Sequence, residues 1–90
     1  MRRQTSYDPA RDYYALLGVE PGADIEEIRR AYRQRVREFH PDLHPDRVEW
    51  ATDQIQLVNE AYTVLRSATR RKEYDRARWP YARSAPRPAG

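Results

Sequence analysis

The sequence that decides the fold of this chain is Phe39-His40-Pro41-Asp42-Leu43-His44-Pro45-Asp46. It contains the tripeptide His-Pro-Asp twice, and the two histidines lie four residues apart. Runs with helical periodicity lie on both sides of it, and a proline disfavours helical angles at the residue before it. The segment is therefore expected to be a loop that joins two helices.

The run before this loop, residues 25–39, predicts a helix. Its apolar residues recur at helical spacing, and they are Ile25, Ile28, Tyr32, Val36 and Phe39. Asp24 and Glu27 have the spacing of a capping box, with Asp in place of the usual Ser or Thr. Glu26 lies four residues before Arg30, in the favourable order for a helix salt bridge. Pro41 is expected to end the helix.

A basic stripe runs along the other side of this helix. Arg29, Arg33 and Arg37 recur every four residues, and Arg30 lies beside them. Rows of like charge are usually a solvated helix face, so the stripe alone is weak support for a docking surface.

The run after the loop, residues 47–66, predicts a second helix. Its apolar stripe consists of Ala51, Ile55, Val58, Tyr62 and Leu65. Asp46 and Glu49 repeat the capping spacing, so Asp46 is expected to cap this helix. Two helices of similar length joined by a short loop should pack antiparallel.

Two short helices are expected at the ends of this hairpin. The first covers residues 12–17, with Asp12 as its cap and Gly18 at its end. The last covers residues 69–76, with Tyr74 as its large apolar anchor. Residues 76–90 are rich in Pro, Arg and Ala and are expected to be a flexible tail or the start of a linker. Residues 1–11 are expected to be an N-terminal tail.

These patterns predict an all-α fold with one thin core. Ninety residues make one small domain. The expected core consists of Tyr14, Leu17, Ile28, Tyr32, Phe39, Ile55, Val58, Tyr62 and Leu65. Aromatic residues at helical spacing usually bury area, so these positions are interpreted as core rather than as a ligand site.

Composition restricts the function further. There is no cysteine, which excludes disulfides and thiolate metal sites. No apolar run reaches the roughly 18–20 residues of a membrane span, and no apolar stretch follows the basic N-terminus as in a secretory signal. Residues 12–75 hold thirteen acidic and ten basic residues, so the overall charge of +3 comes from the two ends. A soluble, cytoplasmic, monomeric protein without nucleic-acid binding is expected.

Residues 12–75 resemble the J domain of the DnaJ family in five segments that occur in the family's order. These are 12–19 (Asp-Tyr-Tyr-Ala-Leu-Leu-Gly-Val), 27–33, 39–42, 59–65 and 70–75. The resemblance implies an antiparallel hairpin of the second and third helices, short first and fourth helices, and a signature loop between the second and third.

The resemblance also implies a task. The loop and the basic face would dock on a DnaK-type chaperone ATPase and stimulate its ATP hydrolysis, with no chemistry, metal or cofactor in the J domain itself. The implied loop residues are His40, Pro41 and Asp42. The implied docking face consists of Arg29, Arg30, Arg33 and Arg37. Asp42 is the expected partner for an arginine of the ATPase. Client proteins would be bound by a region absent from this chain.

The two tripeptides are not expected to be equivalent. The first follows Phe39 in the family's register, whereas in the second Asp46 would cap a helix, Pro45 would stiffen the turn and His44 would be solvated. We therefore predict that His40→Gln abolishes ATPase stimulation and that His44→Gln leaves it nearly intact. A second docking loop is an alternative, and a zinc site from the two histidines is disfavoured by the prolines.

Some residues depart from the family pattern. Arg35 stands where a leucine usually faces the third helix, and it is expected to extend its head outward or to pair with an acid such as Glu60. Leu43 replaces a common lysine and removes a positive charge from the docking surface. Trp50 and Leu57 would form a small exposed patch, or Leu57 would pack against the last helix.

Three rival functions fit parts of the sequence. An adaptor would dock without stimulating, but the intact His40-Pro41-Asp42 argues against it. A nucleic-acid module would use the basic stripe, or Trp79 and Tyr81 of the tail, but the acidic balance of residues 12–75 disfavours it. An enzyme is disfavoured because the sequence has no nucleophile–base pair and no Gly-rich phosphate loop.

Overall fold

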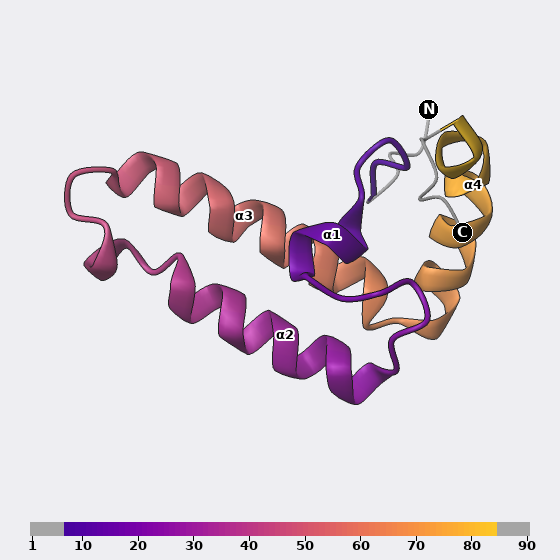
Figure 1. Ribbon diagram of the computed structural model, residues 1–90, viewed down its shortest axis with the longest axis horizontal. Helices are drawn as coiled ribbons and strands as arrows, with labels where there is room; N and C mark the ends of the chain where they lie inside the picture. Colours follow the sequence, from indigo (N-terminus) through magenta and orange to yellow (C-terminus); the bar gives the residue numbers. More distant parts are fainter. Residues whose placement is uncertain (1–6, 85–90) are drawn as a thin grey trace, which may run out of the picture.

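A computed structural model of the chain describes residues 7–84, without the side chains of residues 79–84. Within this range it contains helices and turns and no strand. The helical elements are α1 (Tyr13–Leu17), α2 (Ile25–Glu38), the 3-10 turn η1 (Pro41–Leu43), α3 (Val48–Leu65) and α4 (Ala68–Ser84). Figure 1 shows α2 and α3 as an antiparallel hairpin, with the connecting loop at one end and α4 at the other. The fold is therefore all-α, as the apolar periodicity predicts.

The first two helices begin and end where their capping residues predict. The Asp12 carboxylate accepts from the Ala15 amide at 3.1 Å, and Gly18 ends α1 with a φ of 80°. Such a left-handed residue without a Cβ closes a helix at little cost. Asp24 and Glu27 form the expected capping box, with both bonds at 2.9 Å. These caps set the lengths of α1 and the start of α2.

The core lies between α1, α3 and the N-terminal half of α2. Five residues of the expected core are buried, namely Tyr14, Leu17, Ile28, Val58 and Leu65. The other four are half-buried, namely Tyr32, Phe39, Ile55 and Tyr62. Tyr32 and Tyr62 stack across α2 and α3 with ring centroids 4.1 Å apart. Ala51 of the expected α3 stripe is buried as well, and so are two α3 residues outside that stripe, Ala61 and Val64.

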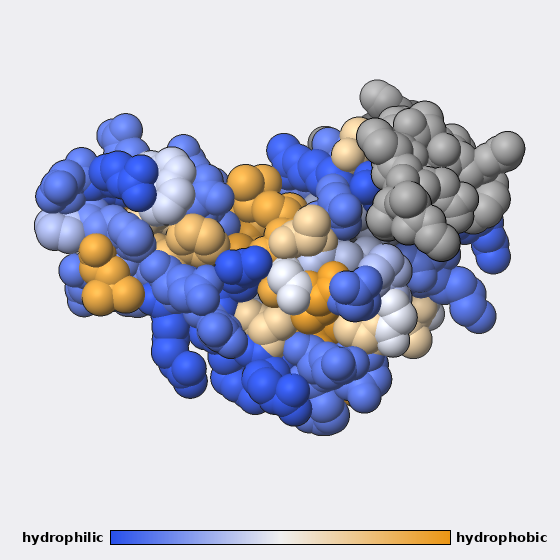
Figure 2. Space-filling model, in the orientation of Figure 1, coloured by the Kyte–Doolittle hydropathy of each residue, from blue (hydrophilic) through white to orange (hydrophobic). Residues whose placement is uncertain are grey.

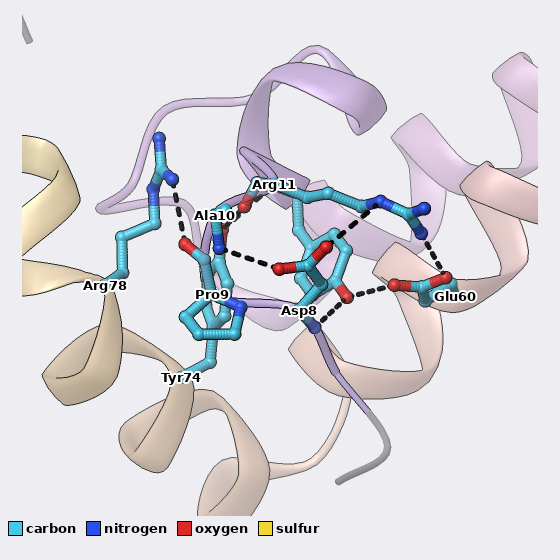
Figure 3. Close-up of polar contacts among 8 residues, drawn as sticks. Asp8, Pro9, Ala10, Arg11, Glu60, Tyr74 and Arg78 are labelled. Carbon is cyan, nitrogen blue, oxygen red and sulfur yellow. Dashed lines mark hydrogen bonds and ion pairs between the residues drawn. The ribbon is translucent and has the colours of Figure 1, made fainter.

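A cluster of tyrosines joins α1 and α4. Tyr13, which periodicity did not place in the core, is completely buried and stacks on Tyr74 at 4.7 Å. The Tyr74 hydroxyl donates to the Arg11 carbonyl, and the Tyr13 hydroxyl donates to Glu60, which Arg11 also contacts at 2.6 Å. Figure 3 shows these contacts around residues 8–11, which lie against α3 and α4. The packed body thus includes residues before Asp12.

Burial raises the pKa of these tyrosines above its ordinary value of about 10, at which the hydroxyl is already protonated at neutral pH. It raises the pKa of Tyr14 to about 12, and the hydrogen bond to Asp75 raises it further. Burial also raises the pKa of Tyr13 and of Tyr74. The hydroxyls therefore remain protonated donors at neutral pH, which is what their carboxylate and carbonyl partners require.

The expected end of the last helix was wrong. α4 continues to Ser84, whereas we expected extended or flexible chain after Arg76. The extension is held by Arg78, which donates to the Pro9 carbonyl at 3.0 Å and lies 3.5 Å from the Asp12 carboxylate. The extension includes Pro80. A proline removes one backbone hydrogen bond from a helix, but contacts with the rest of the fold can hold the helix through it. The expected roles of Trp79 and Tyr81 concern side chains outside the described residues.

Arg35 pairs with an acid, as one of its two expected placements had it, but that acid is Glu38 and not the suggested Glu60. Arg35 donates to the Leu16 carbonyl at 3.2 Å and to Glu38 at 3.0 Å, because α1 ends directly beside it. Leu57, which was expected beside Trp50 or against the last helix, is half-buried. It lines a shallow groove with Leu16 and Ala15 of α1.

Candidate partner-binding site

The first tripeptide forms a short, self-bonded turn at the end of α2. His40 is extended, with a ψ of 133°, and Pro41 begins the 3-10 turn η1. The Leu43 amide bonds the His40 carbonyl at 2.9 Å, and the Asp42 amide donates to the His40 ring at Nδ1 at 3.2 Å. Pro41 needs no donor at the first position of the turn and has a suitable φ. The tripeptide is thus held by its own bonds.

The functional groups of this turn face water. The Asp42 side chain is 90% exposed and the His40 side chain 52% exposed. Because Nδ1 accepts a hydrogen bond, a neutral His40 carries its proton on Nε2. The turn therefore presents an N–H donor and a carboxylate acceptor side by side, which suits recognition of a charged, polar partner.

The second tripeptide has a different structure. The Arg47 amide bonds the His44 carbonyl at 2.9 Å, so Pro45 and Asp46 form the middle of a turn. The cap position of α3 is Arg47, and it has no side-chain capping bond. The prediction that Asp46 caps α3 was therefore wrong, because the turn places the helix start one residue later.

We expected His44 to be a solvated loop residue, and this expectation was wrong. It is half-buried, and its Nε2 lies 2.8 Å from the Glu38 carbonyl at the end of α2. Its ring meets Trp50 edge-on, with centroids 5.3 Å apart. The second histidine therefore connects the end of α2 to the start of α3.

Trp50 is the centre of a small aromatic cluster beneath the loop. Phe39 meets it edge-on at 5.5 Å, and the Arg47 guanidinium lies 4.0 Å above its ring. Trp50 is accordingly half-buried rather than part of an exposed patch. Two large apolar residues near the loop are exposed, Leu43 at 65% and Val48 at 47%.

The basic stripe lies on the outer side of α2. Arg29, Arg30, Arg33 and Arg37 are all exposed, and Figure 2 shows the edge of the molecule along α2 as hydrophilic. Glu26 pairs with Arg29 at 2.9 Å, not with Arg30 as the helix spacing had suggested. Within residues 7–84, no carboxylate lies at ion-pair distance from Arg30, Arg33 or Arg37.

The basic face is next to the loop. At 1.5 Å per helical residue, the row from Arg29 to Arg37 spans about 12 Å and ends three residues before His40. The row therefore runs along α2 toward the turn that carries the exposed Asp42 carboxylate.

Comparison with known proteins identifies the family to which this domain belongs. The DnaJ domain family model matches residues 12–75, which is most of the chain. The chain belongs to the DnaJ domain family. Its J domain is 48% identical over 68 residues to the chaperone protein DnaJ of Hydrogenobacter thermophilus, covering 76% of this chain. It is 51% identical over 67 residues to an uncharacterized J domain-containing protein of Schizosaccharomyces pombe, covering 73% of this chain.

The chain spans less than a third of the length of these relatives. The match covers 18% of the length of the Hydrogenobacter DnaJ and 32% of that of the yeast protein. A curved DNA-binding protein of Serratia proteamaculans is 47% identical over 68 residues, with 76% of this chain and 21% of that protein covered. Proteins with different names thus share this domain.

The described residues hold neither a candidate metal site nor a candidate membrane span. Among residues 7–84, no group of three His, Cys, Asp or Glu residues could hold a metal ion. No helix in that range is long and apolar enough to cross a membrane.

Sequence reasoning missed the residues that support the loop of this J domain. His44, Arg47 and Trp50 were interpreted as a solvated residue, a helix residue and a surface residue. Their contacts cross the loop and have no helical periodicity. The one available signal was a tryptophan in the first turn of a helix, directly after a loop with a second histidine.

Proposed function

We propose that this J domain docks on a DnaK-type chaperone ATPase and stimulates its ATP hydrolysis. The proposal makes it a co-chaperone module that supports protein folding, without metal, cofactor or chemistry of its own. The lack of cysteine suits a reducing compartment such as the cytoplasm.

One observation carries this proposal. The Asp42 carboxylate is 90% exposed, yet its backbone is fixed by the bond from its own amide to His40. A preorganised charged group loses little entropy when it binds. A carboxylate in this position suits an arginine of the partner, since such pairs can form two parallel hydrogen bonds.

The basic face supports the same proposal. Arg30, Arg33 and Arg37 have no ion-pair partner among the described residues, so their charge is available to an acidic surface. Opposite charges across an interface mainly accelerate encounter and orient the partners. In this proposal the row on α2 guides docking, and His40, Pro41 and Asp42 trigger hydrolysis.

The test is an ATPase assay of a DnaK-type chaperone with increasing amounts of this chain. The wild-type chain is expected to stimulate hydrolysis, and His40→Gln is expected to abolish stimulation because it removes the ring that accepts the Asp42 amide. Circular dichroism of His40→Gln should match the wild type. Binding of the wild type without stimulation would instead favour an adaptor that docks without activating.

A further inference from the structure

The end of α2 leaves carbonyls without their helical donors, and that of Glu38 is one of them. In a continued helix, the Glu38 carbonyl would accept from the amide four residues later, which belongs to Asp42. That amide donates to the His40 ring instead, at 3.2 Å. The Glu38 carbonyl is one of the last acceptors of α2, and such groups need a partner from outside the helix.

His44 supplies this partner. Its Nε2 lies 2.8 Å from the Glu38 carbonyl oxygen, and since a carbonyl only accepts, Nε2 carries the proton. The first histidine thus accepts the amide that leaves the helix, and the second donates to the carbonyl that this amide would have bonded. These two hydrogen bonds, one made by each histidine, hold the first tripeptide at the end of α2.

The His44 ring is itself held from the side of α3. Its edge packs on Trp50 at 5.3 Å, and Trp50 is fixed by Phe39 and by the Arg47 guanidinium. Phe39 directly precedes the first tripeptide. The contacts of His44 therefore join the ends of α2 and α3 across the loop.

We propose that His44 is a positioning residue that holds His40, Pro41 and Asp42 at a fixed angle to the basic face of α2. The His44 ring acts through the Glu38 carbonyl and Trp50 and needs no contact with a partner. The effect on ATPase stimulation rests on the proposed function, whereas the effect on loop order can be measured on the isolated chain.

The order of the loop is the direct readout. NMR relaxation of residues 40–43 should give order parameters near the rigid value of about 0.85 in the wild type. In His44→Ala they should fall toward about 0.6, because both contacts are lost. His44→Phe keeps a ring on Trp50 but has no donor, and it should fall between the two. The imidazole nitrogen spectrum of neutral His44 should show the Nε2–H tautomer.

ATPase stimulation gives the second readout. If the loop is in its binding-competent conformation only part of the time, the apparent affinity for the ATPase falls in proportion to the fraction of time spent in that conformation. His44→Ala should raise the concentration for half-maximal stimulation about fivefold, while stimulation at saturation stays near the wild-type value. Arg71→Ala is the matched control, because Arg71 bonds the Ala23 and Pro21 carbonyls far from the loop. It should lower stability and leave the half-maximal concentration unchanged.

The outcomes are separable. Wild-type order parameters for residues 40–43 in both His44→Ala and His44→Phe would overturn the proposal. An equal rise in half-maximal concentration for Arg71→Ala would also overturn it, because the effect would then follow stability alone. If the wild type stimulates no DnaK-type ATPase, the proposed function fails, and the relaxation measurements still decide the role of His44.

Discussion

The two His-Pro-Asp tripeptides have the same sequence and different structures. In the first, the histidine has a ψ of 133°, its ring accepts a hydrogen bond, and the proline begins a 3-10 turn. In the second, the histidine has a ψ of 60°, its ring donates to a carbonyl, and Pro45 and Asp46 lie in a turn. Three identical residues therefore do not determine their own conformation.

The neighbours of each tripeptide explain the difference. The first follows the end of α2, where the Asp42 amide leaves the helix and needs an acceptor. The second precedes α3, where Trp50 offers an aromatic surface and Glu38 a free carbonyl. As a result, Asp42 is exposed on a fixed backbone, and the second histidine becomes part of the scaffold.

The largest expected effect separates the two aspartates. Asp42→Asn should reduce ATPase stimulation at least about tenfold, because it removes the charge that pairs with the partner. Asp46→Asn should change stimulation less than about twofold, since its side chain caps nothing and precedes α3 in an exposed turn. Single-turnover ATPase assays at matched concentrations of the two variants measure both.

Equal losses of stimulation for Asp42→Asn and Asp46→Asn would mean that both tripeptides dock on the ATPase. Thermal melts provide the control: the hydrogen bond and the ion pair of Asp42 both join it to His40 in its own turn, so Asp42→Asn should unfold at nearly the wild-type temperature.

A smaller effect is expected on the basic face beside the first tripeptide. Reversing both Arg29 and Arg33 to Glu should weaken binding without unfolding α2. Arg33→Glu should account for most of this, about tenfold at low salt, and Arg29→Glu for about threefold, because Glu26 already neutralises Arg29. Titration of a fluorescent chaperone at two salt concentrations measures both.

The matched control for this face is Lys72→Glu, an equal charge change on an exposed residue of α4. It should leave affinity unchanged at either salt concentration. Equal losses for Lys72→Glu and Arg33→Glu would mean that overall charge, not the face of α2, determines binding.

Apolar periodicity predicted the helices well. Residues 25–39 and 47–66 were expected, and Ile25–Glu38 and Val48–Leu65 are observed. The caps of α1 and α2 were predictable because capping bonds join residues three apart. The exposed stripe of arginines followed from the same local patterns, whereas its role as a docking face, and the role of the first tripeptide, came from the resemblance to the J domain. Local rules therefore account for the arrangement of the candidate docking surface.

Contacts between distant segments could not be predicted in this way. α4 continues past Arg76 because Arg78 meets the Pro9 carbonyl, sixty-nine residues away in the sequence. Tyr13 is buried because Tyr74 and Glu60 lie over it. The role of His44 depends on where α2 stops and how the chain turns back. Each of these is a property of the folded arrangement and has no periodic signal in the sequence.

The smallest expected effect concerns the second tripeptide alone. Asp46→Ala should change the free energy of unfolding by less than about 0.5 kcal/mol, the range of surface substitutions. A capping aspartate would cost about 1 kcal/mol when replaced by Ala. Urea unfolding followed by circular dichroism resolves this difference.

Asp24→Ala is the matched control, because Asp24 does cap its helix, accepting from the Glu27 amide at 2.9 Å. It should lose about 1 kcal/mol in the same measurement. Equal losses for Asp24→Ala and Asp46→Ala would mean that Asp46 caps α3 in solution. In that case the turn at His44 would have to open, and the contact of His44 with Glu38 would be lost with it.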